Sequence, residues 1–211
     1  MIRNAYILTC DTKSERAQQS KSLLSSIGFQ VTLCDIVSYP MCVATSNLMS
    51  MRRIYQTISR SNDEWAYVFE DDFNLIEPIT LKEIIEYESI SKHLFYLGCC
   101  MEDVSKANTT KNSINGHTVY NVKKTACLHA LALRKSSINL VYSYMEKYSN
   151  LKFLDQIIGD KFVGDHGANV VRYDLISPQE SGHRGVIYQD RIKFPSLWKK
   201  DNWGIKPRSI H

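Results

Sequence analysis

Three consecutive carboxylates, Glu70, Asp71 and Asp72, follow an apolar run at residues 65–69 in the stretch WAYVFEDDFNL. Adjacent negative charges repel one another, so three of them at the end of a buried strand are costly unless a cation lies beside them. Hard cations such as Mg²⁺ and Mn²⁺ prefer oxygen ligands and commonly combine one or two carboxylates with water and substrate phosphate oxygens. The run therefore predicts a divalent-metal site. Helix capping and ion pairing with Arg or Lys are the structural alternatives.

The spacing of the three carboxylates separates their expected roles. Alternate side chains of an extended strand share one face, so Glu70 and Asp72 would lie together while Asp71 points away. The chain has neither a Walker-type glycine-rich loop nor a G-x-G-x-x-G run, which are the usual devices for nucleotide phosphates. We therefore expect a metal ion to do most of the diphosphate binding, with a nucleotide-diphosphate donor whose leaving group the metal neutralises.

The elements that must position these carboxylates alternate along the chain. Apolar runs and a hairpin signal at 115–116 predict strands over residues 5–10, 29–37, 65–69, 93–99, 117–122 and 168–176. Helical spacing and capping patterns predict helices over residues 12–26, 46–59, 80–91, 136–148 and 153–162. The β-α-β-α-β-α-β order of the first half implies a three-layer α/β fold with a largely parallel sheet.

Polar residues follow several of the predicted strands. In parallel α/β sheets ligands bind at the carboxyl ends of the strands. The residues expected at this edge are Thr9–Asp11, Asp35, Glu70–Asp72 and Gly98. The sequence thus predicts one cleft edge that carries polar groups from several strands.

Composition and charge narrow the class of protein. With 211 residues, 44% of them hydrophobic, the chain can bury a core without disulfides, and its six cysteines form no C-x-x-C pair, so we expect reduced thiols. A net charge of +4 is too weak to indicate nucleic acid. The basic and aromatic segment 191–208 is either a solvated tail or a surface for anionic diphosphates or lipids. No segment reaches the ~18 apolar residues that span a bilayer, and no signal peptide is apparent, so we expect a cytoplasmic protein.

The acidic run is one of several segments that follow one another along the chain. AYILTCDTKSERAQQSKSLLSSIGF comes first, and it is followed by TSNLMSMRRIYQTISRSNDEWAYVFEDD, LFYLGCC, TACLHALALRKSSINLV and FLDQIIGD. Taken in order, these segments resemble glycosyltransferase family 25, a GT-A family that includes bacterial lipopolysaccharide galactosyltransferases and procollagen galactosyltransferases. The acidic run resembles the D-x-D-type motif of the family in its E-D-D form, and the first segment resembles its opening strand, loop and first helix. The chain departs from the family pattern in TCDTKSER and MCVATS.

The resemblance implies a Rossmann-like GT-A fold in a single domain over residues 1–211, with a mostly parallel central sheet. A nucleotide-binding half would span about residues 1–100, and an acceptor-side half about residues 101–211. The implied activity is a metal-dependent hexosyltransferase that moves a hexose from a nucleotide sugar to a hydroxyl of a glycan or glycoprotein. A UDP-hexose donor and that acceptor are the expected partners, without nucleic acid and without a transmembrane segment.

The resemblance also implies the metal ligands. Asp72, with Glu70, would hold Mn²⁺ or Mg²⁺ against the donor diphosphate, and Asp71 would contact the ribose or the sugar. GT-A enzymes often recruit a further ligand near the C-terminus, and His183 in SGHRGVIYQDR is the candidate, with Arg184 offsetting diphosphate charge. An ordinary surface histidine is the alternative for His183.

Three further residues are candidates for donor binding. Thr9 and Arg16 fall where the first loop of the family meets the nucleotide. Arg52 follows the start of the helix predicted at 46–59 and is a candidate for the diphosphate. Solvated arginines are the alternative for both Arg16 and Arg52.

An inverting transfer also needs a general base that deprotonates the acceptor hydroxyl. Asp155 is the candidate, because it is an acidic residue inside the apolar segment FLDQ and matches the late Asp of the family. Burial would raise its pKa towards a useful value. A helix-capping role is the alternative, Asp165 and Asp190 are lesser candidates, and a retaining mechanism would not need this base.

Two other functions stay open. A metal-dependent nuclease or phosphotransferase would bind two ions and would want further carboxylates and a lysine, of which EDDFNLIEPITLK offers only Glu77 and Lys82. A non-catalytic nucleotide-sugar-binding module of a glycan-assembly protein would keep the fold and bind the donor without turnover.

Overall fold

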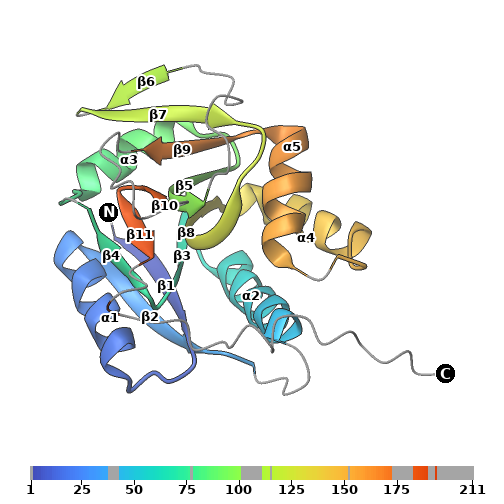
Figure 1. Ribbon diagram of the computed structural model, residues 1–211, viewed down its shortest axis with the longest axis horizontal. Coiled ribbons are helices and arrows are strands. Elements are labelled where there is room, and N and C mark those ends of the chain that lie inside the picture. Colours follow the sequence, from blue (N-terminus) through green and yellow to red (C-terminus); the bar gives the residue numbers. More distant parts are fainter. Residues whose placement is uncertain are drawn as a thin grey trace.

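The computed structural model describes residues 2–37, 43–76, 78–100, 111–114, 116–151, 153–172, 183–189 and 193. These residues build an α/β fold in which helices cover both faces of a central sheet (Figure 1). The helices are α1 Glu15–Ile27, α2 Val43–Arg60, α3 Leu81–Ile90, α4 Ile138–Lys147, a π-helix Gln156–Phe162 and α5 Val163–His166. The three-layer α/β architecture predicted from the sequence is thus present.

Among the described residues, nine strands form the central sheet, and most of them follow one path. In spatial order this path is β2 Phe29–Asp35, β1 Arg3–Thr9, β3 Trp65–Glu70, β8 Ala126–Arg134, β5 Leu94–Cys100, β9 Ala168–Arg172, β7 His117–Val122 and β6 Lys111–Ile114. The ninth strand, β10 His183–Gly185, pairs with β5 off this path. A separate two-stranded sheet joins β4 Phe73–Leu75 to β11 Ile187–Gln189.

The sheet is mixed, which corrects the prediction of a mostly parallel one. Strands β1, β2 and β3 are parallel neighbours, and β5 is parallel to β9. Between β3 and β5, however, β8 runs antiparallel to both of them. Strand β8, with the sequence ACLHALALR, is absent from the predicted strands. Ala and Leu favour helix, and the run has no alternation that would indicate a strand. Burial on both faces explains why this central strand lacks alternation.

Two hydrophobic clusters, one on each face of the sheet, hold the layers together. One cluster packs α2, α4, the π-helix and α5 against the sheet, with Tyr55 and Phe162 among its fully buried side chains. The other packs α1 and α3, with Tyr67, Phe69 and Phe95 in edge-on or tilted ring contacts. On that face β8 presents Ala130 and Ala132, whose small side chains leave room for the aromatic rings of neighbouring strands.

Local sequence signals account for several element ends. Helix α1 ends at Gly28, which takes a left-handed φ of 109° that favours glycine. Its N-cap is Ser14, whose side chain accepts from the backbone N–H of Ala17, so α1 begins at Glu15 and not at the predicted residue 12. Helix α3 begins at the predicted capping box of Thr80 and Glu83. The predicted hairpin joins β6 to β7.

The prediction that all cysteines are reduced thiols is wrong for one of the described cysteines. Cys10, Cys34 and Cys99 are free, but Cys127 is disulfide-bonded. A spacing rule cannot detect such a bond, because a disulfide needs only that two thiols meet in the fold.

Two predictions concern regions that the structure describes only in part. Within the described ranges, none of the helices combines the length and the apolar character needed to cross a membrane. Of the basic segment 191–208, only Lys193 is among the described residues, and the predicted strand at 168–176 is described as far as Arg172.

Candidate functional site

The carboxyl ends of β1, β3 and β5 lie at the same edge of the sheet, because these strands run in the same direction. Thr9 ends β1 and Glu70 ends β3 there, and Asp35 pairs with Thr9 in the β1–β2 register. Strand β8 runs the other way, so its first residue, Ala126, pairs with Cys100 at this edge. The structure thus brings together the strand ends that the sequence analysis predicted to form the site.

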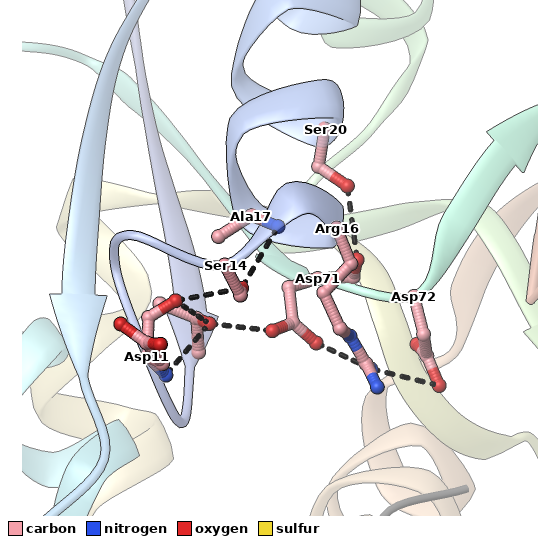
Figure 2. A network of polar contacts seen from close by, with 8 residues as sticks. Asp11, Ser14, Arg16, Ala17, Ser20, Asp71 and Asp72 are labelled. Atoms are coloured by element: carbon pink, nitrogen blue, oxygen red, sulfur yellow. Dashed lines mark hydrogen bonds and ion pairs between the residues drawn. The ribbon is translucent and has the colours of Figure 1, made fainter. Parts of the chain in front are cut away.

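Asp71 is held by three polar contacts (Figure 2). The hydroxyl of Thr9 donates to Asp71 Oδ2 at 2.5 Å, and Arg16 Nη2 donates to Asp71 Oδ1 at 2.5 Å. The backbone oxygen of Asp71 accepts from Ser20 Oγ on α1 at 3.0 Å. The carboxylate is buried and both of its oxygens accept hydrogen bonds, so Asp71 ties α1 to the end of β3.

Arg16 also lies beside Asp72. Its Nη2 atom is 3.7 Å from Asp72 Oδ2, and the guanidinium group lies between the two carboxylates (Figure 2). The strand ends at Glu70, and a bend at residues 71–72 replaces the extended geometry, so the expected alternation of Asp71 and Asp72 does not apply. The cation that neutralises part of this acidic run is therefore a guanidinium of the chain itself. The ion-pairing alternative holds for Asp71.

The loop between β1 and α1 fixes Arg16 at this edge. Ser14 donates to the carbonyl oxygen of Asp11 through both its backbone N–H, at 3.1 Å, and its hydroxyl, at 2.7 Å. The backbone N–H of Asp11 in turn donates to Thr9 Oγ1 at 3.2 Å. Because α1 starts at Glu15, Arg16 extends from the first turn of the helix towards the end of β3.

Glu70 and Asp72 are the carboxylates with which a metal ion could be held. Within the described ranges, no group of three His, Cys, Asp or Glu side chains is arranged to bind a metal ion. Two carboxylates suit Mg²⁺ or Mn²⁺ when substrate phosphate oxygens and water complete the coordination. The donor set therefore fits a metal that binds together with a diphosphate.

The backbone of His183 and Arg184 reaches the same edge. In the β10–β5 pairing, His183 lies opposite Cys100 and Arg184 lies opposite Cys99. The structure does not describe the side chains of these two residues, so their predicted contacts lie outside the described part of the chain. Their roles stay predictions.

Gly98 allows the chain around β10 and β11 to approach β5 closely. A Cβ atom at this position would lie 2.0 Å from the backbone oxygen of Ile187 and 2.6 Å from Nε2 of His129. His129 is fully buried in β8. It precedes Ala130, which pairs with Phe69 near the end of β3, so His129 lies next to that strand end. The sequence analysis did not consider His129. Its signal was a lone polar residue inside the apolar run ACLHALALR.

Replacing Gly98 with Ala is expected to displace β11 and to destabilise the fold by roughly 1–3 kcal/mol, the usual cost of overpacking. The control is Gly164→Ala in α5, because a Cβ there would meet its nearest neighbour at 3.8 Å. Urea denaturation measures both variants. If Gly98→Ala were as stable as Gly164→Ala, the close packing of Ile187 on Gly98 would be wrong.

Asp155 lies at the same edge through its contact with the start of β8. It is the N-cap residue of the π-helix, and its Oδ1 accepts from the backbone N–H of Gln156 at 2.9 Å. Burial raises its pKa, while the backbone amides of Gln156 and Cys127 act in the opposite direction. The predicted rise in the pKa of Asp155 is confirmed. The same side chain also caps the helix, as the alternative interpretation expects.

The remaining candidates do not join this arrangement among the described contacts. Asp165 accepts from the Tyr144 hydroxyl at 2.5 Å, near the start of β9 and hence at the opposite edge of the sheet. Arg52 lies in α2, where its backbone oxygen accepts from the Tyr142 hydroxyl at 2.7 Å. Asp190 lies outside the described residues.

A cavity of about 570 Å³ opens at the opposite edge of the sheet, near the start of β3 and the end of β8. The charged side chains that line it already have partners, and Asp63 accepts from Asn4 Nδ2 at 2.6 Å. Arg134 and Glu64 are 2.7 Å apart, and Lys135 Nζ donates to the backbone oxygen of Ser61. The carboxyl edge is the better candidate site, because ligands of α/β sheets bind there.

No protein-family model matches this chain, and no curated protein matches its sequence. Several solved structures are similar to it at low identity. A glycosyltransferase involved in the glycosylation of the major capsid of PBCV-1 is 13% identical, with a TM-score of 0.47 and 80% of each chain covered. A197 from STIV is 10% identical, with a TM-score of 0.44, over 88% of this chain and 94% of that one.

A third similar structure is the glycosyltransferase GlyE of Streptococcus pneumoniae TIGR4. It is 10% identical, with a TM-score of 0.42, and the match covers 81% of this chain and 45% of that one. At these identities and TM-scores, the three likenesses decide neither the family nor the function of this chain.

Proposed function

We propose that this protein is a metal-dependent glycosyltransferase that moves a hexose from a nucleotide sugar to a hydroxyl of a glycan or glycoprotein. The observation that carries the proposal is the meeting of two kinds of acidic group at one sheet edge. One is the acidic end of β3 with Arg16 beside it, and the other is Asp155, a separate half-buried carboxyl group of raised pKa. An inverting transfer from a diphosphate donor needs both, since the leaving group must be neutralised and a general base must take the proton of the acceptor hydroxyl.

On the donor side, Asp72 and Glu70 would hold Mn²⁺ or Mg²⁺. The metal would neutralise the diphosphate leaving group when it is bound. Arg16 already lies within 3.7 Å of Asp72 and is the cationic side chain best placed to meet a diphosphate next to that metal. Thr9 and Asp71 hold Arg16 in place beside the end of β3. They would therefore contribute to donor binding by positioning Arg16.

On the acceptor side, Asp155 would take the proton of the attacking hydroxyl onto a carboxylate oxygen. A general base works best when its pKa lies near the operating pH, and burial moves the pKa of Asp155 in that direction. This role implies an inverting transfer. A UDP-hexose donor and a GT-A enzyme of the family 25 type complete the proposal, and the order of the quoted sequence segments supports both. A cytoplasmic location is proposed with them.

Donor binding gives the direct test. With Mn²⁺ and a UDP-sugar at about 100 times its Kd, the wild-type protein is expected to gain roughly 2.7 kcal/mol of stability in a thermal-shift assay. Asp72→Asn is expected to lose this gain and to hydrolyse the donor on the order of 10²–10³-fold more slowly. Glu64→Gln is the control, because Glu64 is 68% exposed and lies just before the start of β3, at the opposite edge of the sheet.

The outcomes separate the candidate functions. A wild-type protein that no nucleotide sugar stabilises with Mn²⁺ would refute the proposal. Cleavage of DNA or RNA that Asp72→Asn abolishes would favour the nuclease. Tight donor binding without turnover on any acceptor would favour the non-catalytic module.

A further inference from the structure

Cys127, the second residue of β8, has an unusual backbone conformation. Its φ is 61°, and within the described ranges no other non-glycine residue has a positive φ. For residues with a side chain this left-handed conformation is strained and persists only where the surroundings hold it. Cys127 is also disulfide-bonded, so a covalent bond restrains its side chain.

The chain just before Cys127 is packed tightly against the π-helix that carries Asp155. The backbone N–H of Thr125 donates to the carbonyl oxygen of Gly159 at 3.2 Å. A Cβ atom at Gly159 would lie 2.1 Å from the carbonyl oxygen of Thr125, so only glycine permits this approach. A change in the backbone at residues 125–127 is therefore transmitted to the π-helix. Mid-helix π turns are themselves frequent at functional sites.

The backbone amide of Cys127 also interacts with the carboxyl group of Asp155. The direction of a backbone N–H depends on φ of its own residue, so the left-handed conformation of Cys127 decides whether its N–H faces this carboxylate. The other hydrogen bond to the carboxylate comes from Gln156 within the π-helix, and it does not depend on β8.

We propose that Cys127 is a positioning residue for Asp155, because its disulfide holds the left-handed backbone conformation that keeps its N–H directed at the Asp155 carboxylate. The catalytic consequence rests on the proposed function, since it assumes that Asp155 is the general base. The structural claim does not depend on it. Reduction of the disulfide then acts as a switch on Asp155.

The chemistry of the switch is a thiol–disulfide exchange. A dithiol such as dithiothreitol breaks the disulfide of Cys127, each sulfur of the former bond gains a proton, and the dithiol is oxidised to its cyclic disulfide. Cys127 can then relax to a negative φ, and its N–H turns away from Asp155. Loss of a hydrogen bond to the charged form raises the pKa of a carboxyl group.

Two other titratable groups act on Asp155 electrostatically. The negative charge of Asp160, on the same π-helix, raises the pKa of Asp155. Asp160 Oδ1 is itself 3.7 Å from Lys124 Nζ. Tyr96, from β5, interacts with Asp155 electrostatically and is fully buried. None of these groups belongs to the disulfide, so the effect of reduction can be separated from theirs.

The test is a carboxyl titration by NMR on the full chain labelled with ¹³C-aspartate, in which Asp155→Asn assigns the signal of Asp155. Dithiothreitol is expected to raise the titration midpoint of Asp155 by about one pKa unit, a tenfold change in its ionisation constant. Cys127→Ser is expected to show the raised midpoint with or without dithiothreitol. Cys127→Gly is expected to keep the wild-type midpoint under both conditions, because glycine adopts a positive φ without strain.

Two results would overturn the proposal. One is a wild-type midpoint that does not move on reduction while the disulfide is shown to be broken by thiol counting. The other is a Cys127→Gly variant that titrates like Cys127→Ser. If the serine variant fails to fold, the reduced wild-type protein and the glycine variant still decide the question. Because the titration needs neither donor nor acceptor, it remains valid if the protein is not a glycosyltransferase.

Discussion

Asp155→Asn is expected to lower the turnover of the nucleotide sugar by about 10²–10⁴-fold, the usual contribution of a general base. The amide can still accept the backbone hydrogen bond of Gln156, but it cannot take a proton from the acceptor hydroxyl. Release of the nucleoside diphosphate at saturating donor measures the rate. The wild-type activity should fall as the pH drops through the raised pKa of Asp155, because the protonated carboxyl is no longer a base.

The same substitution should not weaken the fold. The pKa of Asp155 is raised by burial in the folded state, so the folded protein binds the proton more tightly than the unfolded chain does. Between the two pKa values the stability therefore falls as pH rises, and at neutral pH the ionised carboxylate is a net cost. Asn removes this cost, so the variant should be at least as stable as the wild-type protein and should lose this pH dependence. Sites that serve chemistry commonly show such a trade-off.

Asp160→Asn is the matched control, because Asp160 lies on the same π-helix and its partly exposed side chain pairs with Lys124. It should keep its activity within about twofold, since an exposed ion pair contributes little and Asp160 has the smallest of the influences on the pKa of Asp155. An active Asp155→Asn, or one that loses activity only because it unfolds, would remove Asp155 from the role of base.

Glu88→Ala is expected to destabilise the protein by about 3–5 kcal/mol, the cost of leaving a buried charge without its partner. Arg3 in β1 donates to Glu88 in α3 through Nε at 2.7 Å and Nη2 at 2.6 Å. The hydroxyl of Tyr67 in β3 donates to the same carboxylate at 2.6 Å. All three side chains are buried, so truncating Glu88 leaves a guanidinium and a hydroxyl without their acceptor.

Two further variants show whether burial causes this effect. Glu64→Ala breaks an ion pair to Arg134 at a similar distance of 2.7 Å, but Glu64 is 68% exposed, so the expected loss is below about 1 kcal/mol. The triple variant Arg3→Met, Tyr67→Phe, Glu88→Leu replaces all three members of the buried network with apolar side chains and should recover much of the lost stability. Urea denaturation compares all three. Equal losses for Glu88→Ala and Glu64→Ala would contradict the argument.

Sequence patterns predicted the parts of the fold that depend on neighbouring residues. The end of α1 at Gly28 and the start of α3 at Thr80 follow from local backbone and capping chemistry. The acidic end of β3 was visible because charge follows directly on an apolar run. The upward pKa shift of Asp155 was foreseeable, since an acidic residue inside an apolar segment is bound to be partly buried.

Other features depend on residues far apart in the chain, and only the tertiary structure decided them. Strand β8 lies antiparallel between β3 and β5, a place that no local pattern in an Ala- and Leu-rich run can indicate. Arg16 pairs with Asp71 across 55 positions of sequence. The guanidinium therefore supplies a positive charge at a place where the carboxylate run alone predicts a metal ion. The sequence by itself determined that three neighbouring carboxylates at the end of β3 repel one another. Tertiary packing decided that the Arg16 guanidinium neutralises part of this charge, because the first turn of α1 meets the end of β3 only in the folded chain.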